Sequence, residues 1–326
     1  MFYRVEPSAR TRGRLALVAV TAGVIAFSSA CGGDDALIDP TPEGLSVGDT
    51  LITTISGGLF RSFIVHRPPN HDPAEPAPLL IVFHGATITA LDMKQLIGID
   101  EVTDAAGFVT VYPDGINRGW AVGCGCTVPD QIGIDDLEFA AKIVEVMAGS
   151  YGIDSTRVYA SGLSQGGRMA QYLACKRSDL IAGVASVAAS TPIELADRCL
   201  GSAMNPTPIV FFLGTEDAFF LWDGIPGVLL TAPQTIDAWR EINACSEQVE
   251  EGMEPDRAAD GTTVRTEKYT DCDSGVEVVL YAVEGGGHTW PDQALELSSS
   301  LGLVTRDISA AEVMADFLLR FQRTNP

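Results

Sequence analysis

The chain has little positive charge and little histidine. Of its 326 residues 21 are Lys or Arg against 43 Asp or Glu, which gives a net charge of −22, and only four are His. A field of this sign repels phosphate backbones and argues against a nucleic-acid partner. The sequence also lacks a second Cys pair or a His cluster at zinc spacing, so no metal site is expected. With 46% hydrophobic residues, the chain is long enough to fold as one large domain, and we expect one.

The N-terminus lacks an apolar run long enough to span a bilayer. The run from Leu15 to Phe27 has 13 residues, whereas a transmembrane helix needs roughly 20. Arginines precede it, and Ser28, Ser29 and Ala30 lead from it to Cys31, so residues 1–30 are predicted to be a lipoprotein-type signal peptide with Cys31 lipidated. The alternative is ordinary secretion, with Cys31 removed or left near the new terminus. Residues 31–49 are expected to form a flexible tether, and residues 50–326 the folded domain.

The cysteines agree with export. Six remain after Cys31, an even number, as expected of disulfides in an oxidising compartment: Cys124, Cys126, Cys175, Cys199, Cys245 and Cys272. Cys124 and Cys126 are so close that each is expected to pair elsewhere. A thiolate metal site at these two cysteines is the weaker alternative. Spacing alone leaves the connectivity open.

Apolar runs predict an α/β fold. Leu51–Ile55 and Leu59–Val65 flank Gly57-Gly58 as an antiparallel hairpin. Runs typical of buried strands follow at Leu79–Phe83, Phe108–Tyr112, Arg157–Ala160, Gly183–Val187, Ile209–Leu213 and Val278–Val283. Asp135–Met147 and Ala310–Phe321 have helical periodicity. We therefore expect a mostly parallel central sheet with helices on both faces.

One pentapeptide indicates a nucleophile. Gly162-Leu163-Ser164-Gln165-Gly166 follows a predicted strand and precedes a helix-compatible segment. This is the Gly-x-Ser-x-Gly nucleophile elbow, which exposes the serine hydroxyl at a helix N-terminus. The alternative is a glycine-rich structural turn.

Chain order then selects the partners of Ser164. An elbow serine is followed along the chain by an acid and then a histidine, and only His288 comes after Ser164. The acid is expected after the strand Ile209–Leu213, where we choose Asp217 over Glu216 and Asp223. Asp217 would accept the Nδ1–H of His288, unless it is a solvated loop carboxylate.

The strand ending in Phe83 leads into His84-Gly85-Ala86, where this architecture supplies an oxyanion donor. We assign the oxyanion hole to the backbone N–H groups of Ala86 and Gln165. His84 itself is expected to organise the loop.

With these motifs the chain resembles the polyhydroxybutyrate depolymerase and feruloyl esterase family over about residues 50–322. The matching blocks are His84-Gly85, Tyr112-Pro113-Asp114-Gly115, Gly119-Trp120, Asp135-Asp136, Gly162–Gly167, Gly214–Asp217 and Gly287–Pro291. The resemblance implies an α/β-hydrolase fold, a triad of Ser164, Asp217 and His288, no cofactor, and a Cys245–Cys272 disulfide. Residues 218–222 and 86–89 depart from the family pattern.

The implied activity is that of an exported serine carboxylesterase acting through an acyl-enzyme. Its ester substrate is expected to be a feruloyl-polysaccharide or a short hydroxyalkanoate polyester. Four aromatics are either substrate walls or ordinary core: Trp120, Phe219, Trp222 and Trp290. The alternatives are a catalytically silent surface binding protein and a peptidase of the same fold. We expect no obligate protein partner, and membrane contact only through the lipidated N-terminus.

Overall fold

The computed structural model describes residues 48–200, 204–296 and 298–324. The predicted signal peptide, Cys31 and nearly all of the predicted tether lie outside these residues. No helix within the described ranges has the length and apolarity needed to cross a membrane.

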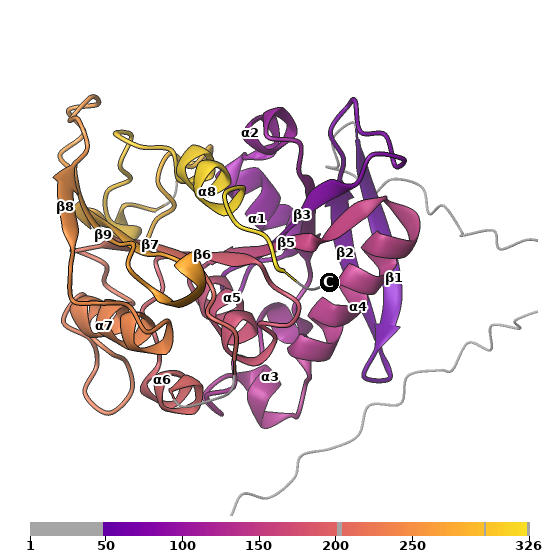
Figure 1. The fold of residues 1–326 in the computed structure, drawn as a ribbon, viewed down its shortest axis with the longest axis horizontal. Coiled ribbons are helices and arrows are strands. Elements are labelled where there is room, and N and C mark those ends of the chain that lie inside the picture. The colour runs from indigo at the N-terminus through magenta and orange to yellow at the C-terminus, as the bar shows by residue number, and fades with distance from the viewer. Residues whose placement is uncertain (1–47, 201–203, 297, 325–326) are drawn as a thin grey trace, which may run out of the picture. The chain divides into compact units, whose positions relative to one another are not determined.

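In the described part of the chain, ten strands form one sheet in the order β1-β2-β4-β3-β5-β6-β7-β10-β9-β8 (Figure 1). The pairs from β4 to β10 are parallel, whereas both ends of the sheet are antiparallel. The strands are β1 (Asp49–Ser56), β2 (Leu59–His66), β3 (Ala77–Phe83), β4 (Val109–Pro113), β5 (Ile153–Leu163), β6 (Gly183–Val187), β7 (Ile209–Gly214), β8 (Glu250–Met253), β9 (Thr263–Tyr269) and β10 (Val278–Glu284). The predicted hairpin and parallel centre are confirmed; the antiparallel β8–β9 edge was not predicted.

Helices cover both faces of the sheet, as expected. They are α1 (Ala90–Ile97), α2 (Asp100–Ala105), α3 (Val128–Gln131), α4 (Asp136–Ser150), α5 (Gln165–Lys176), α6 (Ile193–Cys199), α7 (Ala232–Ile242) and α8 (Ala310–Leu318), with short 3₁₀ turns at Ile116–Arg118, Asp273–Gly275 and Ser299–Leu301. Side chains of α4, α5 and α7 share one core cluster with the sheet, while those of α1 and α8 share another. Figure 1 shows the two groups on opposite sides.

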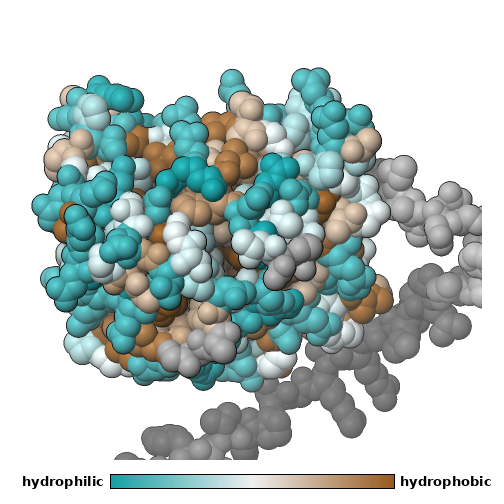
Figure 2. Space-filling view, in the orientation of Figure 1, coloured by the Kyte–Doolittle hydropathy of each residue, from teal (hydrophilic) through white to brown (hydrophobic). Residues whose placement is uncertain are grey.

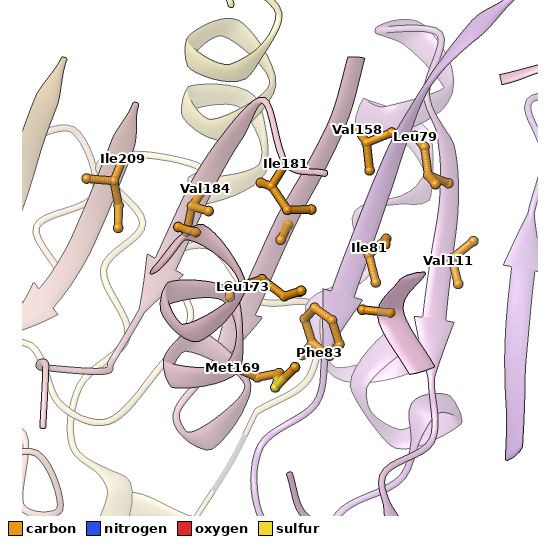
Figure 3. Close-up of a cluster of buried hydrophobic side chains, with 14 of the residues drawn as sticks. Leu79, Ile81, Phe83, Val111, Val158, Met169, Leu173, Ile181, Val184 and Ile209 are labelled. Carbon is orange, nitrogen blue, oxygen red and sulfur yellow. The ribbon is translucent and has the colours of Figure 1, made fainter. Parts of the chain in front are cut away.

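The core forms because the central strands are apolar on both faces. Every residue of β3 is buried, and alternate side chains enter the two core clusters: Leu79, Ile81 and Phe83 one, Leu80 and Val82 the other. Figure 3 shows Met169 and Leu173 of α5 beside Phe83 and its neighbours. Hydrophilic side chains cover most of the face in Figure 2, in keeping with the large net charge.

The parallel centre determines where loops meet. Strands β3, β5, β7 and β10 run in the same direction, so their C-terminal ends lie at one edge of the sheet. The segments that follow them carry His84, Ser164, Asp217 and His288. Ligands of open α/β sheets bind at this edge.

Candidate active site

Ser164 lies in a strained turn between β5 and α5. Its φ and ψ are 59° and −122°, a conformation rare outside glycine. Its backbone N–H donates to Val187 O at 2.8 Å, which attaches the turn to β6. The residue is the N-cap of α5, so its side chain lies beside the positive end of the helix dipole. This geometry is that of the predicted nucleophile elbow.

Two glycines of the elbow are required by close backbone packing. A Cβ at Gly166 would lie 2.0 Å from Phe83 O, and a Cβ at Gly162 would lie 2.3 Å from the carbonyl carbon of Gly166. Real carbon atoms cannot approach so closely. The sharp strand-to-helix turn therefore needs glycine on both sides of Ser164.

His288 and Asp217 meet although 71 residues separate them in the chain. His288 Nδ1 lies 2.7 Å from Asp217 Oδ2. Asp217 is buried, with 3% of its surface exposed, and His288 is 9% exposed. A carboxylate acceptor at Nδ1 makes this nitrogen the donor and leaves the lone pair on Nε2.

The second carboxylate oxygen of Asp217 is also satisfied. Asp217 Oδ1 accepts hydrogen bonds from the backbone N–H groups of Phe219 and Phe220, each at 2.8 Å. The carboxylate is therefore held in one orientation toward the imidazole. Glu216 and Asp223, the two acids not chosen, are exposed. The geometry supports Asp217 as the acid partner.

Two aromatic rings border the imidazole. Phe220 lies parallel to it, with ring centroids 5.4 Å apart and planes 7° apart. Phe219 lies 5.1 Å from it and is 56% exposed. Phe219 was a substrate-wall candidate from the sequence, whereas Phe220 was not predicted; its only sequence signal is that residues 218–222 depart from the family pattern.

Ser164 and His288 come from different elements of the fold, the turn between β5 and α5 and the loop after β10. Within the described chain no hydrogen bond joins the Ser164 hydroxyl to His288. Their connection is indirect: the guanidinium carbon of Arg168, in the first turn of α5, lies 4.2 Å from the centroid of the Phe220 ring that stacks on His288. The hydrogen bond between a catalytic serine and its histidine is often long or poorly aligned until substrate binds.

The loop after β3 approaches the elbow closely. A Cβ at Gly85 would lie 3.6 Å from Ser164 Cβ, so the backbone that leads into Ala86 passes beside the serine. Gln165 begins α5, and the first N–H groups of a helix have no intrahelical acceptor. Backbone amides at Ala86 and Gln165 are thus available on two segments that flank Ser164.

His84 organises this loop, as expected. It is fully buried; its Nδ1 lies 2.7 Å from Gly85 O, and its Nε2 accepts from the backbone N–H of Gly115 at 2.9 Å. Burial lowers the pKa of His84, which keeps the ring neutral and able to accept at Nε2.

Two of the four aromatic candidates are core residues, so that of the two roles left open for them the substrate wall is wrong. Trp120 is 0% exposed and donates from Nε1 to His84 O at 2.8 Å, and Trp290 is 1% exposed. Neither offers surface to a ligand. Trp222 is partly buried and packs against the core. Phe219 is the exposed member of the set.

The six cysteines form three disulfides: Cys124–Cys126, Cys175–Cys199 and Cys245–Cys272. The Cys245–Cys272 pairing is as expected from the resemblance. The expectation that Cys124 and Cys126 pair elsewhere is wrong. Gly125 between them has a φ of 67°, which reverses the chain and brings the two Cα atoms to 5.1 Å, an ordinary separation for a disulfide.

The chain is similar to known esterases. A family model described as "Esterase PHB depolymerase" matches residues 61–202. The protein named "Putative esterase NocK" of Nocardia uniformis subsp. tsuyamanensis is 31% identical over 91% of this chain and 96% of its own length. Feruloyl esterase B of Piromyces equi is 28% identical over 71% of this chain, which spans 43% of that protein. Poly(3-hydroxyalkanoate) depolymerase C of Paucimonas lemoignei is 29% identical over 43% of this chain and 35% of its own length.

Solved structures share the fold. An acetyl xylan esterase from Aspergillus awamori superposes with a TM-score of 0.55 at 16% identity, covering 74% of this chain and 94% of that one. A thermostable esterase gives a TM-score of 0.53 at 14% identity, over 85% of this chain and 64% of that one.

The elbow on a parallel sheet and the relatives together define the class: this is a carboxylic ester hydrolase with the α/β-hydrolase fold. Within that class, the chain belongs to the esterase PHB depolymerase family.

Proposed function

We propose that the protein is an exported serine esterase that hydrolyses feruloyl-polysaccharide or short hydroxyalkanoate polyester bonds through an acyl-enzyme. The observation that carries the proposal is the 2.7 Å contact between His288 Nδ1 and Asp217 Oδ2, at the same edge of the sheet as the strained Ser164 turn. A serine needs an adjacent base to become a nucleophile, and the base needs an orienting partner.

In the proposed first half-reaction, Ser164 Oγ attacks the ester carbonyl carbon while His288 Nε2 takes the hydroxyl proton. The backbone N–H groups of Ala86 and Gln165 hold the tetrahedral oxyanion. When the carbon–oxygen bond to the alcohol breaks, His288 returns the proton to the leaving alkoxide, and Asp217 stabilises the transient imidazolium.

In the second half-reaction His288 removes a proton from water, whose oxygen attacks the acyl carbon. The bond between this carbon and Ser164 Oγ then breaks, His288 returns the proton to Ser164 Oγ, and the carboxylic acid is released. The exposed Phe219 ring next to His288 offers an apolar contact for the substrate.

Labelling with a fluorophosphonate followed by peptide mapping tests the nucleophile. We expect one modified peptide, containing Ser164, and no label in Ser164→Ala. Modification at another serine would refute the assignment, and absence of any label and any ester hydrolysis would favour the silent binding protein. Hydrolysis rates then identify the ester class, measured on methyl ferulate, p-nitrophenyl butyrate and hydroxybutyrate oligomers. Hydrolysis rates on a series of peptide amides test the peptidase alternative.

Export is supported by the three disulfides, which persist in oxidising compartments. We propose that the mature chain begins at a lipidated Cys31. Mass spectrometry of the membrane fraction should find the diacylated N-terminal peptide. An unmodified terminus at another residue would refute the anchor while leaving the esterase proposal intact.

A further inference from the structure

Arg168 brings a positive charge to the candidate active site. Its backbone N–H donates to Ser164 O at 3.2 Å, so it stands in the first turn of the elbow helix α5. Its guanidinium carbon lies 4.2 Å from the centre of the Phe220 ring, and that ring stacks on His288. One aromatic side chain therefore contacts both the guanidinium and the imidazole.

This guanidinium has no anionic partner among the described residues. Its Nε is buried without a hydrogen-bond acceptor, and no described carboxylate forms an ion pair with it. Arg61, a buried arginine whose guanidinium also lies over an aromatic ring, does have a carboxylate partner: its Nη2 lies 2.7 Å from Asp136 Oδ1. An unpaired, partly desolvated cation is costly, so most proteins pair such groups.

Arg168 stays charged at neutral pH. Burial lowers the pKa of Arg168 to about 10, although the negative charge of Glu194 opposes this shift. The chain as a whole carries a net charge of −22, so its long-range field repels anions. Binding of a carboxylate at this edge of the sheet therefore requires a local positive charge such as that of Arg168.

We propose that Arg168 binds a carboxylate group carried by the ester substrate, so that the preferred substrates are esters with a free carboxylate on the acid or the alcohol portion. The planar guanidinium matches a carboxylate in geometry and charge. This proposal rests on the esterase function proposed above and narrows it: a hydroxyalkanoate oligomer ends in such a carboxylate, whereas methyl ferulate has none.

Matched neutral probes test the charge preference. The linear dimer of 3-hydroxybutyrate is compared with its C-terminal amide, and monomethyl terephthalate with methyl 4-carbamoylbenzoate. For at least one pair, Arg168→Gln should lower kcat/KM for the carboxylate ester tenfold or more relative to its amide, since a charge-assisted hydrogen bond contributes about 1.5–3 kcal/mol. Arg168→Lys, which keeps the charge, should restore part of the preference.

Binding separates this proposal from the esterase proposal. In the Ser164→Ala background, calorimetry should show that the added Arg168→Gln weakens binding of the carboxylate ester tenfold or more relative to the amide, whether or not the parent protein is an esterase. Arg240→Gln is the matched control, because Arg240 also lies over a ring, 4.5 Å from that of Tyr269, but outside the site. It should leave the ratio unchanged. Equal losses for carboxylate and amide in both pairs, or no loss in either, would overturn the role of Arg168.

Discussion

Arg61 Nη2 lies 2.7 Å from Asp136 Oδ1, and both side chains are almost completely buried. The other oxygen of Asp136 accepts from the backbone N–H of Ala121 at 2.7 Å, and the guanidinium carbon of Arg61 lies 3.8 Å from the centre of the Phe139 ring. This ion pair therefore joins β2, α4 and the segment that carries Trp120.

Removal of one member of this pair should be strongly destabilising. Asp136→Ala leaves the Arg61 guanidinium buried without its partner, and we expect the free energy of unfolding to fall by about 3–5 kcal/mol. Urea denaturation measures the change. Glu277→Ala is the control: it breaks an ion pair with the half-exposed Arg320 and should cost about 0–1 kcal/mol. Equal effects of the two substitutions would contradict the importance assigned to the buried pair.

A second charged cluster should make stability depend on pH. Burial by itself lowers the pKa of His66, but the hydrogen bond that the imidazole donates to Asp49 and the negative charges of Asp100 and Asp104 outweigh both burial and the positive charge of Lys94, so that the net shift of this pKa is upward. A raised pKa in the folded state means that folding takes up a proton near neutral pH. The resulting stability is complete below about pH 6.5 and is lost as the pH rises through the folded-state pKa.

Unfolding free energies between pH 5.5 and 8.5 measure this contribution. The decline above about pH 6.5 should be reduced in His66→Gln. His71→Gln, which removes a histidine that contacts the backbone oxygen of Tyr151, should keep the decline. The same decline in both variants would rule out His66 as its source.

Substitutions in the predicted triad should lower kcat far more than a substitution of the neighbouring acid Glu216. Asp217→Asn should lower kcat on the order of 10⁴-fold, because an amide at this position no longer holds the required tautomer of His288. Glu216→Gln, on the exposed neighbouring side chain, should change kcat far less. Ser164→Ala and His288→Ala should each lower kcat by several orders of magnitude. A full rate in Asp217→Asn would exclude the assigned acid.

The elbow glycines allow a purely steric test. In Gly166→Ala the new methyl would lie 2.0 Å from Phe83 O, so we expect a shift of β3 against α5 with loss of stability and of esterase activity. Gly149→Ala places its methyl in open space at an exposed position of α4 and should be neutral or stabilising by about 0.5–1 kcal/mol. Thermal melting and initial rates compare the two; unchanged values for Gly166→Ala would contradict the packing.

Some features were not predictable from local patterns. The β8 residues Glu250–Met253 are all exposed, so this edge strand has no apolar alternation to mark it. The Cys124–Cys126 disulfide depends on the positive φ of Gly125, which spacing does not reveal. The core positions of Trp120 and Trp290 likewise depend on contacts distant in the chain, since a tryptophan serves equally well as core or as a wall.

The sequence by itself determined the parallel strands, the Ser164 elbow and the family, because these depend on short apolar runs and on glycines at fixed spacing. It also limited the base to His288, since only this histidine follows Ser164. Only the tertiary structure decided that Asp217 rather than Glu216 contacts His288, and that Arg168 reaches the Phe220 ring beside it. The first contact joins residues 71 positions apart in the chain, and the second joins residues 52 positions apart. They meet because the parallel strands of the sheet place the loops that follow them at one edge, which no local sequence pattern reveals.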